Sequence, residues 1–166
     1  MAKNTNKPGD LAANFLAMKG TFVRTVTRAT GEFERKAIPN VVTAEGLNIL
    51  ANRAVADTSS KFGWIAVGTA NYTPHINSQE ILECDRKAAG SLITSSQEFI
   101  VAIATWGGAA DSVTSNQLEM AAIANDPTSG SGVYLNVANG LSTVLADSDF
   151  LHLEVQVQVG SHALTL

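Results

Sequence analysis

The segment from Leu151 to Val159 constrains the fold more than any other part of this chain, because apolar and polar residues alternate in it without a break. One face of a strand here would carry only apolar side chains, those of Leu151, Leu153, Val155, Val157 and Val159. The other face would carry His152, Glu154, Gln156 and Gln158. Nine residues of strand span about 30 Å. This pattern predicts an antiparallel sheet with one face on a core and one face toward water.

Other segments repeat the β pattern between clusters of turn residues. We expect strands over residues 21–30, 33–37, 62–67, 91–95, 98–105 and 133–137, with Phe99, Val101 and Ile103 on one face of their strand. Turn signals separate them at 30–32, 68–71, 107–108 and 126–132. Two segments stay open: residues 79–86 fit a helical turn or a short strand, and residues 118–124 fit a strand or a helix.

One helix is predicted over residues 44–55. Thr43 is a suitable N-cap, and Glu45 lies in the first turn, where the helix dipole favours a negative charge. Apolar residues then recur at helical spacing, at Leu47, Leu50, Ala51 and Ala54. The fold class that follows is mainly β: an antiparallel β-sandwich or jelly-roll-like fold with one short α-helix.

The first 20 residues differ from the rest, and we expect them to form an extended, flexible arm before a single β-rich domain over residues 21–166. The arm starts with a polar stretch and then carries four apolar side chains, those of Leu11, Phe15, Leu16 and Met18. Nothing nearby in the sequence is available to bury them. Either they form a short amphipathic turn that docks on their own domain, or they dock on a neighbouring subunit. Extended, 20 residues reach about 65 Å.

Composition excludes several classes of function. Only 16% of the residues are charged and the net charge is −4, with no run of Lys or Arg, so nucleic-acid binding is not expected. No apolar run reaches the length of a membrane span, and no secretory signal is evident. A single cysteine, Cys84, cannot form an intrachain disulfide, and we expect it to be a small apolar residue in a reducing, aqueous compartment.

No catalytic, cofactor-binding or metal-binding residues are predicted, and the chain is not expected to be an enzyme. His75, His152 and His162 lack the spacing of metal ligands. Glu80, Glu83 and Asp85 form the densest acidic cluster, but Arg86 and Lys87 follow directly, so local ion pairing is the expected role, and exposed pairs contribute little. We expect Asp147 and Asp149 to be turn residues.

The aromatic residues leave one alternative function open. Trp64, Tyr72, Trp106 and Tyr134 could form the stacking platform of a carbohydrate-binding module. Aromatic residues in this number are more often core or interface anchors.

Three short motifs carry a resemblance to a known class of proteins. Residues 43–52 read T-x-x-G-x-N-x-x-A, residues 65–69 read Ile-Ala-Val-Gly-Thr, and residues 82–86 contain an L-E-x-x-R element. In this order they resemble small β-rich virion proteins of tailed bacteriophages. The family usually has Gly-Thr-Gly after the Ile-Ala-Val strand, whereas this chain has Ala70, which would be strained if position 70 required a positive φ.

The resemblance implies a structural protein of the virion, made in the host cytoplasm, without cofactors or catalytic residues. The expected function is that of a capsid decoration (cement) protein that binds the major capsid protein and copies of itself, as a trimer. A tail, neck or tail-fibre adaptor is the alternative within the same particle. The expected contact residues are the apolar residues of the arm, Leu11, Phe15, Leu16 and Met18.

Overall fold

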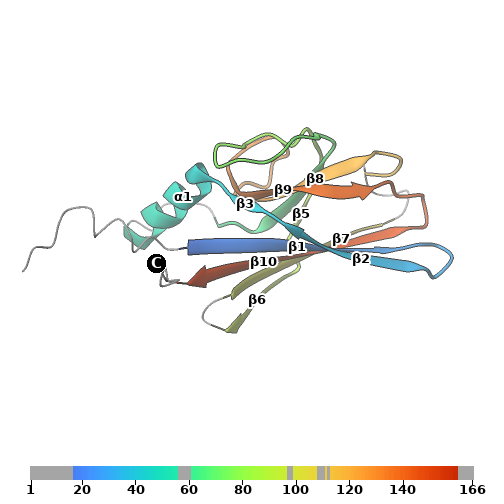
Figure 1. Cartoon of the computed structure of the whole chain (residues 1–166), viewed down its shortest axis with the longest axis horizontal. Coiled ribbons are helices and arrows are strands. Elements are labelled where there is room, and N and C mark those ends of the chain that lie inside the picture. The colour runs from blue at the N-terminus through green and yellow to red at the C-terminus, as the bar shows by residue number, and fades with distance from the viewer. Residues whose placement is uncertain (1–16, 56–60, 97–98, 108–110, 112, 161–166) are drawn as a thin grey trace, which may run out of the picture.

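A computed structural model describes residues 17–55, 61–96, 99–107, 111 and 113–160 of the chain (Figure 1). They form ten strands and one helix: β1 (Ala17–Thr27), β2 (Phe33–Pro39), β3 (Val41–Val42), α1 (Ala44–Val55), β4 (Trp64–Gly68), β5 (Glu83–Ala88), β6 (Ser91–Ser96), β7 (Phe99–Gly107), β8 (Leu118–Ala124), β9 (Tyr134–Thr143) and β10 (Phe150–Gly160). Sheet A has the strand order β2-β1-β10-β7-β6, and sheet B has the order β3-β9-β8-β4-β5. Neighbouring strands are antiparallel in both sheets, which confirms the predicted mainly β, sandwich-like fold.

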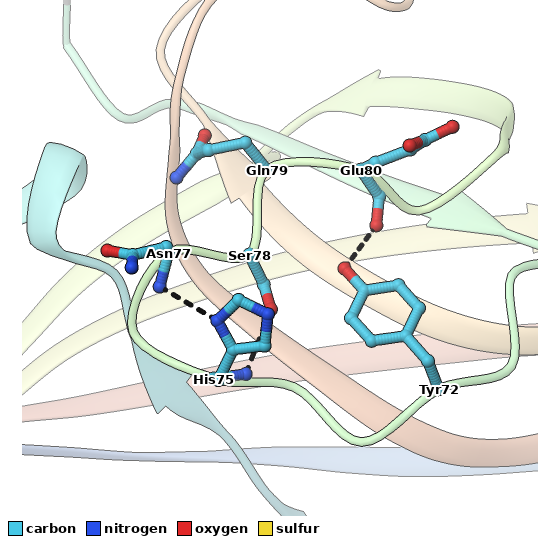
Figure 2. Close-up of a pocket in the computed structure, with 6 residues that line it drawn as sticks. All are labelled: Tyr72, His75, Asn77, Ser78, Gln79 and Glu80. Carbon is cyan, nitrogen blue, oxygen red and sulfur yellow. Dashed lines mark hydrogen bonds between the residues drawn. The ribbon is translucent and has the colours of Figure 1, made fainter.

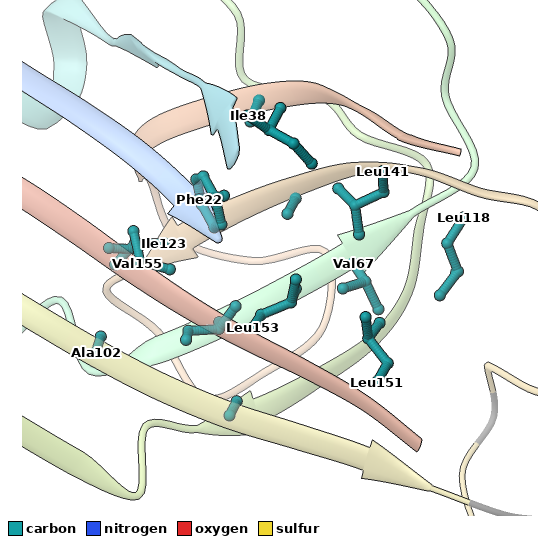
Figure 3. Close-up of a cluster of buried hydrophobic side chains, with 14 of the residues drawn as sticks. Phe22, Ile38, Val67, Ala102, Leu118, Ile123, Leu141, Leu151, Leu153 and Val155 are labelled. Carbon is teal, nitrogen blue, oxygen red and sulfur yellow. The ribbon is translucent and has the colours of Figure 1, made fainter. Parts of the chain in front are cut away.

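Strand β10 lies at the centre of sheet A, as its long alternating pattern suggests. It pairs with β1 on one side and with β7 on the other. Leu151, Leu153, Val155 and Val157 are fully buried, and the intervening polar side chains are half-buried on the other face. Figure 3 shows how Leu153 and Phe22 of sheet A meet Val67 and Ile123 of sheet B, so the two sheets share one core.

The two sheets differ in how their outer faces are covered. On sheet B, the outward residues Ala66, Met120 and Ala122 are buried in a second apolar cluster that also contains Ile81, from the β4–β5 connection. None of the described elements covers the outer face of sheet A. That face carries Thr, Val, Ile, Gln and Phe residues, with Arg35 and Glu154 among its charged residues.

Helix α1 begins and ends where the sequence predicts. The Thr43 hydroxyl accepts a hydrogen bond from the backbone N–H of Gly46 at 3.0 Å and donates one to the carbonyl of Tyr134. Gly46 lets the helix approach β9 closely, because a Cβ on this residue would lie 2.5 Å from the Cα of Leu135. The spacing between Thr43 and Gly46 therefore has a structural reason: the first turn of α1 is docked on β9.

The structure also decides the segments that the sequence left open. Residues 79–82 belong to the irregular β4–β5 connection, and a strand follows from Glu83. Residues 118–124 are strand β8. Ala70 does not have a positive φ, so the condition under which alanine would be strained there is not met. The positive φ in this region lies instead at Leu82, whose φ is 48°.

The start of β1 places the first strand earlier than the sequence suggests. Residues 17–20 pair with residues 157–160 of β10, so they are part of sheet A. Met18, one of the four predicted arm residues, lies opposite Val159 in this pairing. Leu11, Phe15 and Leu16 lie outside the described residues.

Candidate interaction surface

The end of sheet A farthest from Ala17 carries a row of outward-facing residues with two exposed phenylalanines. Phe33 of β2 lies opposite Thr27 of β1, Thr27 lies opposite Phe150 of β10, and Phe150 lies opposite Gly107 of β7. Phe33 is 72% exposed and Phe150 is 52% exposed. A Cβ on Gly107 would lie 2.3 Å from Cδ1 of Phe150, so the Phe150 ring rests directly on this glycine.

Val144, which is 42% exposed, lies near the same end, in the connection from β9 to β10. We call Phe33, Val144 and Phe150 the tip patch. Figure 1 shows the β1–β2 turn and the β9–β10 connection next to each other at this end of the molecule. Exposed large apolar side chains that gather at one place mark interaction sites more often than isolated ones do.

An ion pair joins the β1–β2 turn to the β9–β10 connection, next to the tip patch. Arg28, at the β1–β2 turn, donates from Nη1 to Oδ2 of Asp149 at 2.7 Å and to the carbonyl of Val144 at 2.8 Å. Asp149 is buried and also accepts hydrogen bonds from the backbone N–H groups of Ala29 and Ala146. Asp149 is therefore a turn residue, as predicted, and it also joins the two connections. These four hydrogen bonds hold the two connections in one arrangement next to the tip patch.

A second ion pair continues this network below the sheet surface. Arg24 of β1 is 6% exposed and donates to Glu34 of β2 at 2.8 Å. It also donates to the carbonyls of Leu141 at 2.7 Å and Ser142 at 3.4 Å. The register between β8 and β9 shifts at this point, and Gly140 and Ser142 have positive φ. Arg24 thus binds carbonyls that the irregular end of β9 leaves without a strand partner.

The acidic cluster of the sequence contains a buried ion pair. Arg86 donates to both carboxylate oxygens of Glu83, at 2.8 Å and 2.6 Å, and their side chains are 1% and 4% exposed. Arg86 also donates to the carbonyls of Asp126 and Ser131, and Glu83 accepts from the hydroxyl of Tyr134. The prediction of ion pairing is confirmed for this pair, but the expectation of an exposed pair is wrong. The pair fastens the 126–132 turn to β5.

The hydrogen bonds of this cluster decide its protonation. Burial raises the pKa of the Glu83 carboxyl, but hydrogen bonds from Arg86, Tyr134 and the Gly130 backbone outweigh burial and hold that pKa below its usual value. Burial raises the pKa of the Tyr134 hydroxyl, and its hydrogen bond to the charged Glu83 raises it further. Glu83 is therefore charged and Tyr134 neutral near pH 7. Every donor and acceptor is used inside the protein, which is typical of a structural pair.

The remaining candidate residues are separate from one another. Asp85 accepts a hydrogen bond from the Trp106 indole at 2.9 Å, and Lys87 pairs with Asp111 at 2.7 Å. The exposed His75 accepts through Nδ1 from the N–H of Asn77, and His152 contacts Thr105 on the outer face of sheet A. His162 lies outside the described residues. Within the described part of the chain, no three His, Cys, Asp or Glu side chains form a possible metal site.

The aromatic residues do not share one surface. Trp106 is fully buried and Tyr134 is 6% exposed, so both contribute to the interior. Tyr72 lines an open hollow of about 480 Å³ on the β4–β5 connection, together with His75, Asn77, Ser78, Gln79 and Glu80 (Figure 2). A stacking platform for sugars would therefore need side chains other than Trp106 and Tyr134.

The hydrogen bonds around this hollow belong to the fold of the connection itself. The Tyr72 hydroxyl donates to the carbonyl of Glu80, and the His75 N–H donates to Ser78 Oγ. The Gln79 side chain bonds the backbone of Tyr134.

Comparison of the chain with protein-family models, with curated proteins and with solved structures finds no significant match. The one described helix is too short and too polar to cross a membrane. The tip patch is therefore the feature of this molecule that bears on function, and no pattern in the sequence predicts it. Phe33 and Phe150 are 117 positions apart in the sequence, and only the register of β1 with its two neighbours brings them into one row.

Proposed function

We propose that this chain is a structural protein of a tailed-bacteriophage virion, made in the host cytoplasm, that decorates the capsid and binds neighbouring protein subunits. The observation that carries the proposal is the tip patch. Two exposed phenylalanines and a valine lie at one end of the sandwich, next to two ion pairs whose Arg24 and Asp149 members are buried. A rigid apolar surface loses little conformational entropy on binding, so it is suited to protein contacts.

The size of the patch favours repeated, shared contacts over a single tight complex. Burying a large apolar side chain contributes about 2 kcal/mol, so the three side chains together contribute roughly 4–6 kcal/mol. Bringing two proteins together costs at least about 4 kcal/mol in lost translational and rotational freedom. The three side chains alone, without further contacts around them, are therefore marginal. Several contacts per subunit on one lattice would add up, which is the situation of a decoration protein.

The motifs behind the family resemblance support the fold more than the function. Thr43 caps α1, Gly46 allows its close packing, and Glu83 and Arg86 fasten a turn. These roles are structural and would be needed in any protein with this sandwich. The expectation that the chain is part of a virion therefore comes from the resemblance, and the expectation that it has a contact surface comes from the tip patch.

The first test is the number of copies of this chain in purified particles from its source, measured by quantitative mass spectrometry against the major capsid protein. A ratio near one copy per capsid subunit supports capsid decoration. A few copies per hundred capsid subunits would overturn decoration in favour of a tail, neck or fibre adaptor. Absence from particles would overturn the virion assignment altogether.

The second test asks whether the tip patch is used on the particle. Phe33→Ser combined with Phe150→Ser should lower the occupancy of the chain on particles that lack it, as measured by co-sedimentation. The matched control combines Ile76→Ser with Leu82→Ser, because these side chains are also about half exposed but lie on the β4–β5 connection. Equal binding of both variants would remove the tip patch from the proposal.

A further inference from the structure

We infer that the tip patch binds the apolar part of the N-terminal segment, residues 11–16, of a second copy of this chain. The inference rests on the proposed function, in which the segment is a contact element. It deepens that function by naming the partner that the tip patch binds. Its starting point is that the segment enters sheet A at Ala17, whereas the tip patch lies at the opposite end of the same sheet (Figure 1).

The reach of the segment decides between its own tip patch and that of another copy. The tip row lies at the level of Thr27, ten residues along β1 from Ala17, which is about 33 Å in a strand. Six residues separate Leu11 from Ala17, and fully extended they reach about 20 Å. Phe15 and Leu16 are still closer to Ala17. The apolar residues of the segment therefore cannot reach the tip patch of their own copy, but they can reach that of a neighbour.

Strand β2 offers a way to bind such a segment. The backbone N–H of Arg28 donates to the carbonyl of Glu32, and the backbone N–H of Asn40 donates to the carbonyl of Gly20. Hydrogen-bonded pairs alternate along an antiparallel ladder, so the even-numbered residues of β2 also form their backbone hydrogen bonds with β1. The backbone groups of Phe33, Arg35 and Ala37 consequently point away from β1. No described strand pairs with this edge, because β2 is the outermost strand of sheet A. An extended segment added here would gain backbone hydrogen bonds next to Phe33.

The side chains on both sides are compatible. Residues 11–16 contain Leu11, Phe15 and Leu16 and no charged residue, which suits the exposed Phe33 and Phe150. Asp10 precedes them, and Arg35 is exposed on the same face as Phe33, in the next row of the sheet. An acidic residue beside an apolar run thus matches a cationic residue beside an apolar patch.

The contact is of the head-to-tail kind, because each copy uses two different surfaces at opposite ends of sheet A. Such contacts close into a ring when the rotation between copies allows it, and otherwise continue as a chain. The trimer expected from the family resemblance would be one such ring.

The test uses two full-length variants of the purified chain without particles. The segment variant carries Leu11→Ser, Phe15→Ser and Leu16→Ser, and the tip variant carries Phe33→Ser and Phe150→Ser. In analytical ultracentrifugation, the unmodified chain should assemble and each variant alone should be monomeric. An equimolar mixture of the two variants should form a dimer and nothing larger, because each retains the surface that the other lacks. The control with Ile76→Ser and Leu82→Ser should assemble like the unmodified chain.

Three outcomes would overturn the inference: a mixture that stays monomeric, a segment variant that still assembles, or an unmodified chain that is monomeric. Because substitutions can impair folding, a second measurement uses only the unmodified chain. An excess of a synthetic peptide of residues 1–16 should dissociate its assembly, and the same peptide with Phe15→Ser and Leu16→Ser should need at least about tenfold more. Equal potency of the two peptides would contradict the inference. Because particles are not involved, failure here would leave the copy-number test of the proposed function intact.

Discussion

Glu83 and Arg86 show, at the scale of single residues, what a local pattern cannot decide. Their spacing and opposite charge are visible in the sequence and predict an ion pair. Their burial is not visible there, because it depends on the 126–132 turn and on Tyr134, about 40 to 50 positions away. The same limit applies to Arg24, whose position on an alternating strand does not show that the irregular end of β9 needs its guanidinium.

Replacing Arg86 should therefore destabilise the protein strongly. Arg86→Met would leave the buried Glu83 carboxylate without its main partner and two backbone carbonyls without a donor. We expect the free energy of unfolding to fall by about 3–5 kcal/mol, as for other buried pairs that lose one member. Urea unfolding measures this. Arg35→Met, at an exposed position, is the matched control and should change stability by less than about 0.5 kcal/mol; a similar loss in both variants would contradict the buried role.

The carboxylates of the ion pairs predict how stability depends on pH. The Ala146 N–H and Arg28 hold the pKa of Asp149 below its usual value. At Asp111, burial raises the pKa, but the ion pair with Lys87 and the hydrogen bond from the Gly107 N–H outweigh burial, so the pKa is lowered. The pKa of Glu83 is also lowered. A lowered folded pKa stabilises the fold above the unfolded pKa, and this contribution disappears as the pH falls through the folded value. Stability should thus be constant from about pH 7 to pH 5 and decrease below about pH 4.5.

Urea unfolding at a series of pH values tests this dependence. Asp149→Asn should be less stable at pH 7 and should lose less stability than the unmodified chain on acidification. If the free energy of unfolding fell with pH by the same amount in both proteins, Asp149 would not contribute to the acid sensitivity.

At the scale of elements, the sequence predicts those parts whose signals are local. The helix over 44–55 and the core face of β10 are confirmed, because a cap and a strict alternation need no distant partner. Strand β7 shows the limit. Its alternation is correct, but Val101 and Ile103 face outward and the smaller Ala102 and Ala104 face the core, together with Trp106. Which face is inside depends on the space left by Leu151, Leu153 and the opposite sheet.

The docking of α1 on β9 gives a prediction of unusual sign. Glycine to alanine inside a helix usually stabilises it, by up to about 1 kcal/mol. Gly46→Ala should instead lower the melting temperature, because the added Cβ would lie 2.5 Å from the Cα of Leu135 and force the helix away from β9. Gly63→Ala is the control, since a Cβ there has no neighbour within 4 Å. A melting temperature of Gly46→Ala at or above that of the unmodified chain would show that α1 moves away at no cost.

At the scale of the whole molecule, the pairing of the first and last strands sets where the folded unit begins. Residues 17–20 are predicted to be part of the arm, yet β10 extends to Gly160 and pairs with each of the four. The sequence alone could not show this, because the pairing joins positions about 140 residues apart. The tip patch escaped prediction for the same reason.

Two truncations test this boundary. Removing residues 1–16 should leave the melting temperature of the folded unit unchanged, because β1 stays whole. Removing residues 1–20 should lower it, because four residues of β10 lose their partners. Thermal unfolding at low protein concentration compares them without the contribution of assembly. Equal melting temperatures would mean that residues 17–20 do not stabilise the sheet.

The central place of β10 also has a consequence for synthesis on the ribosome. The hairpins β1–β2 and β6–β7 are joined into one sheet only by β10, the last strand of the described chain. A nascent chain that has not yet released β10 has two separate hairpins in place of sheet A, and it lacks Phe150 of the tip patch. Assembly of sheet A is thus delayed until β10 has left the ribosome, and translation products that stop before β10 cannot present the surface through which copies would join.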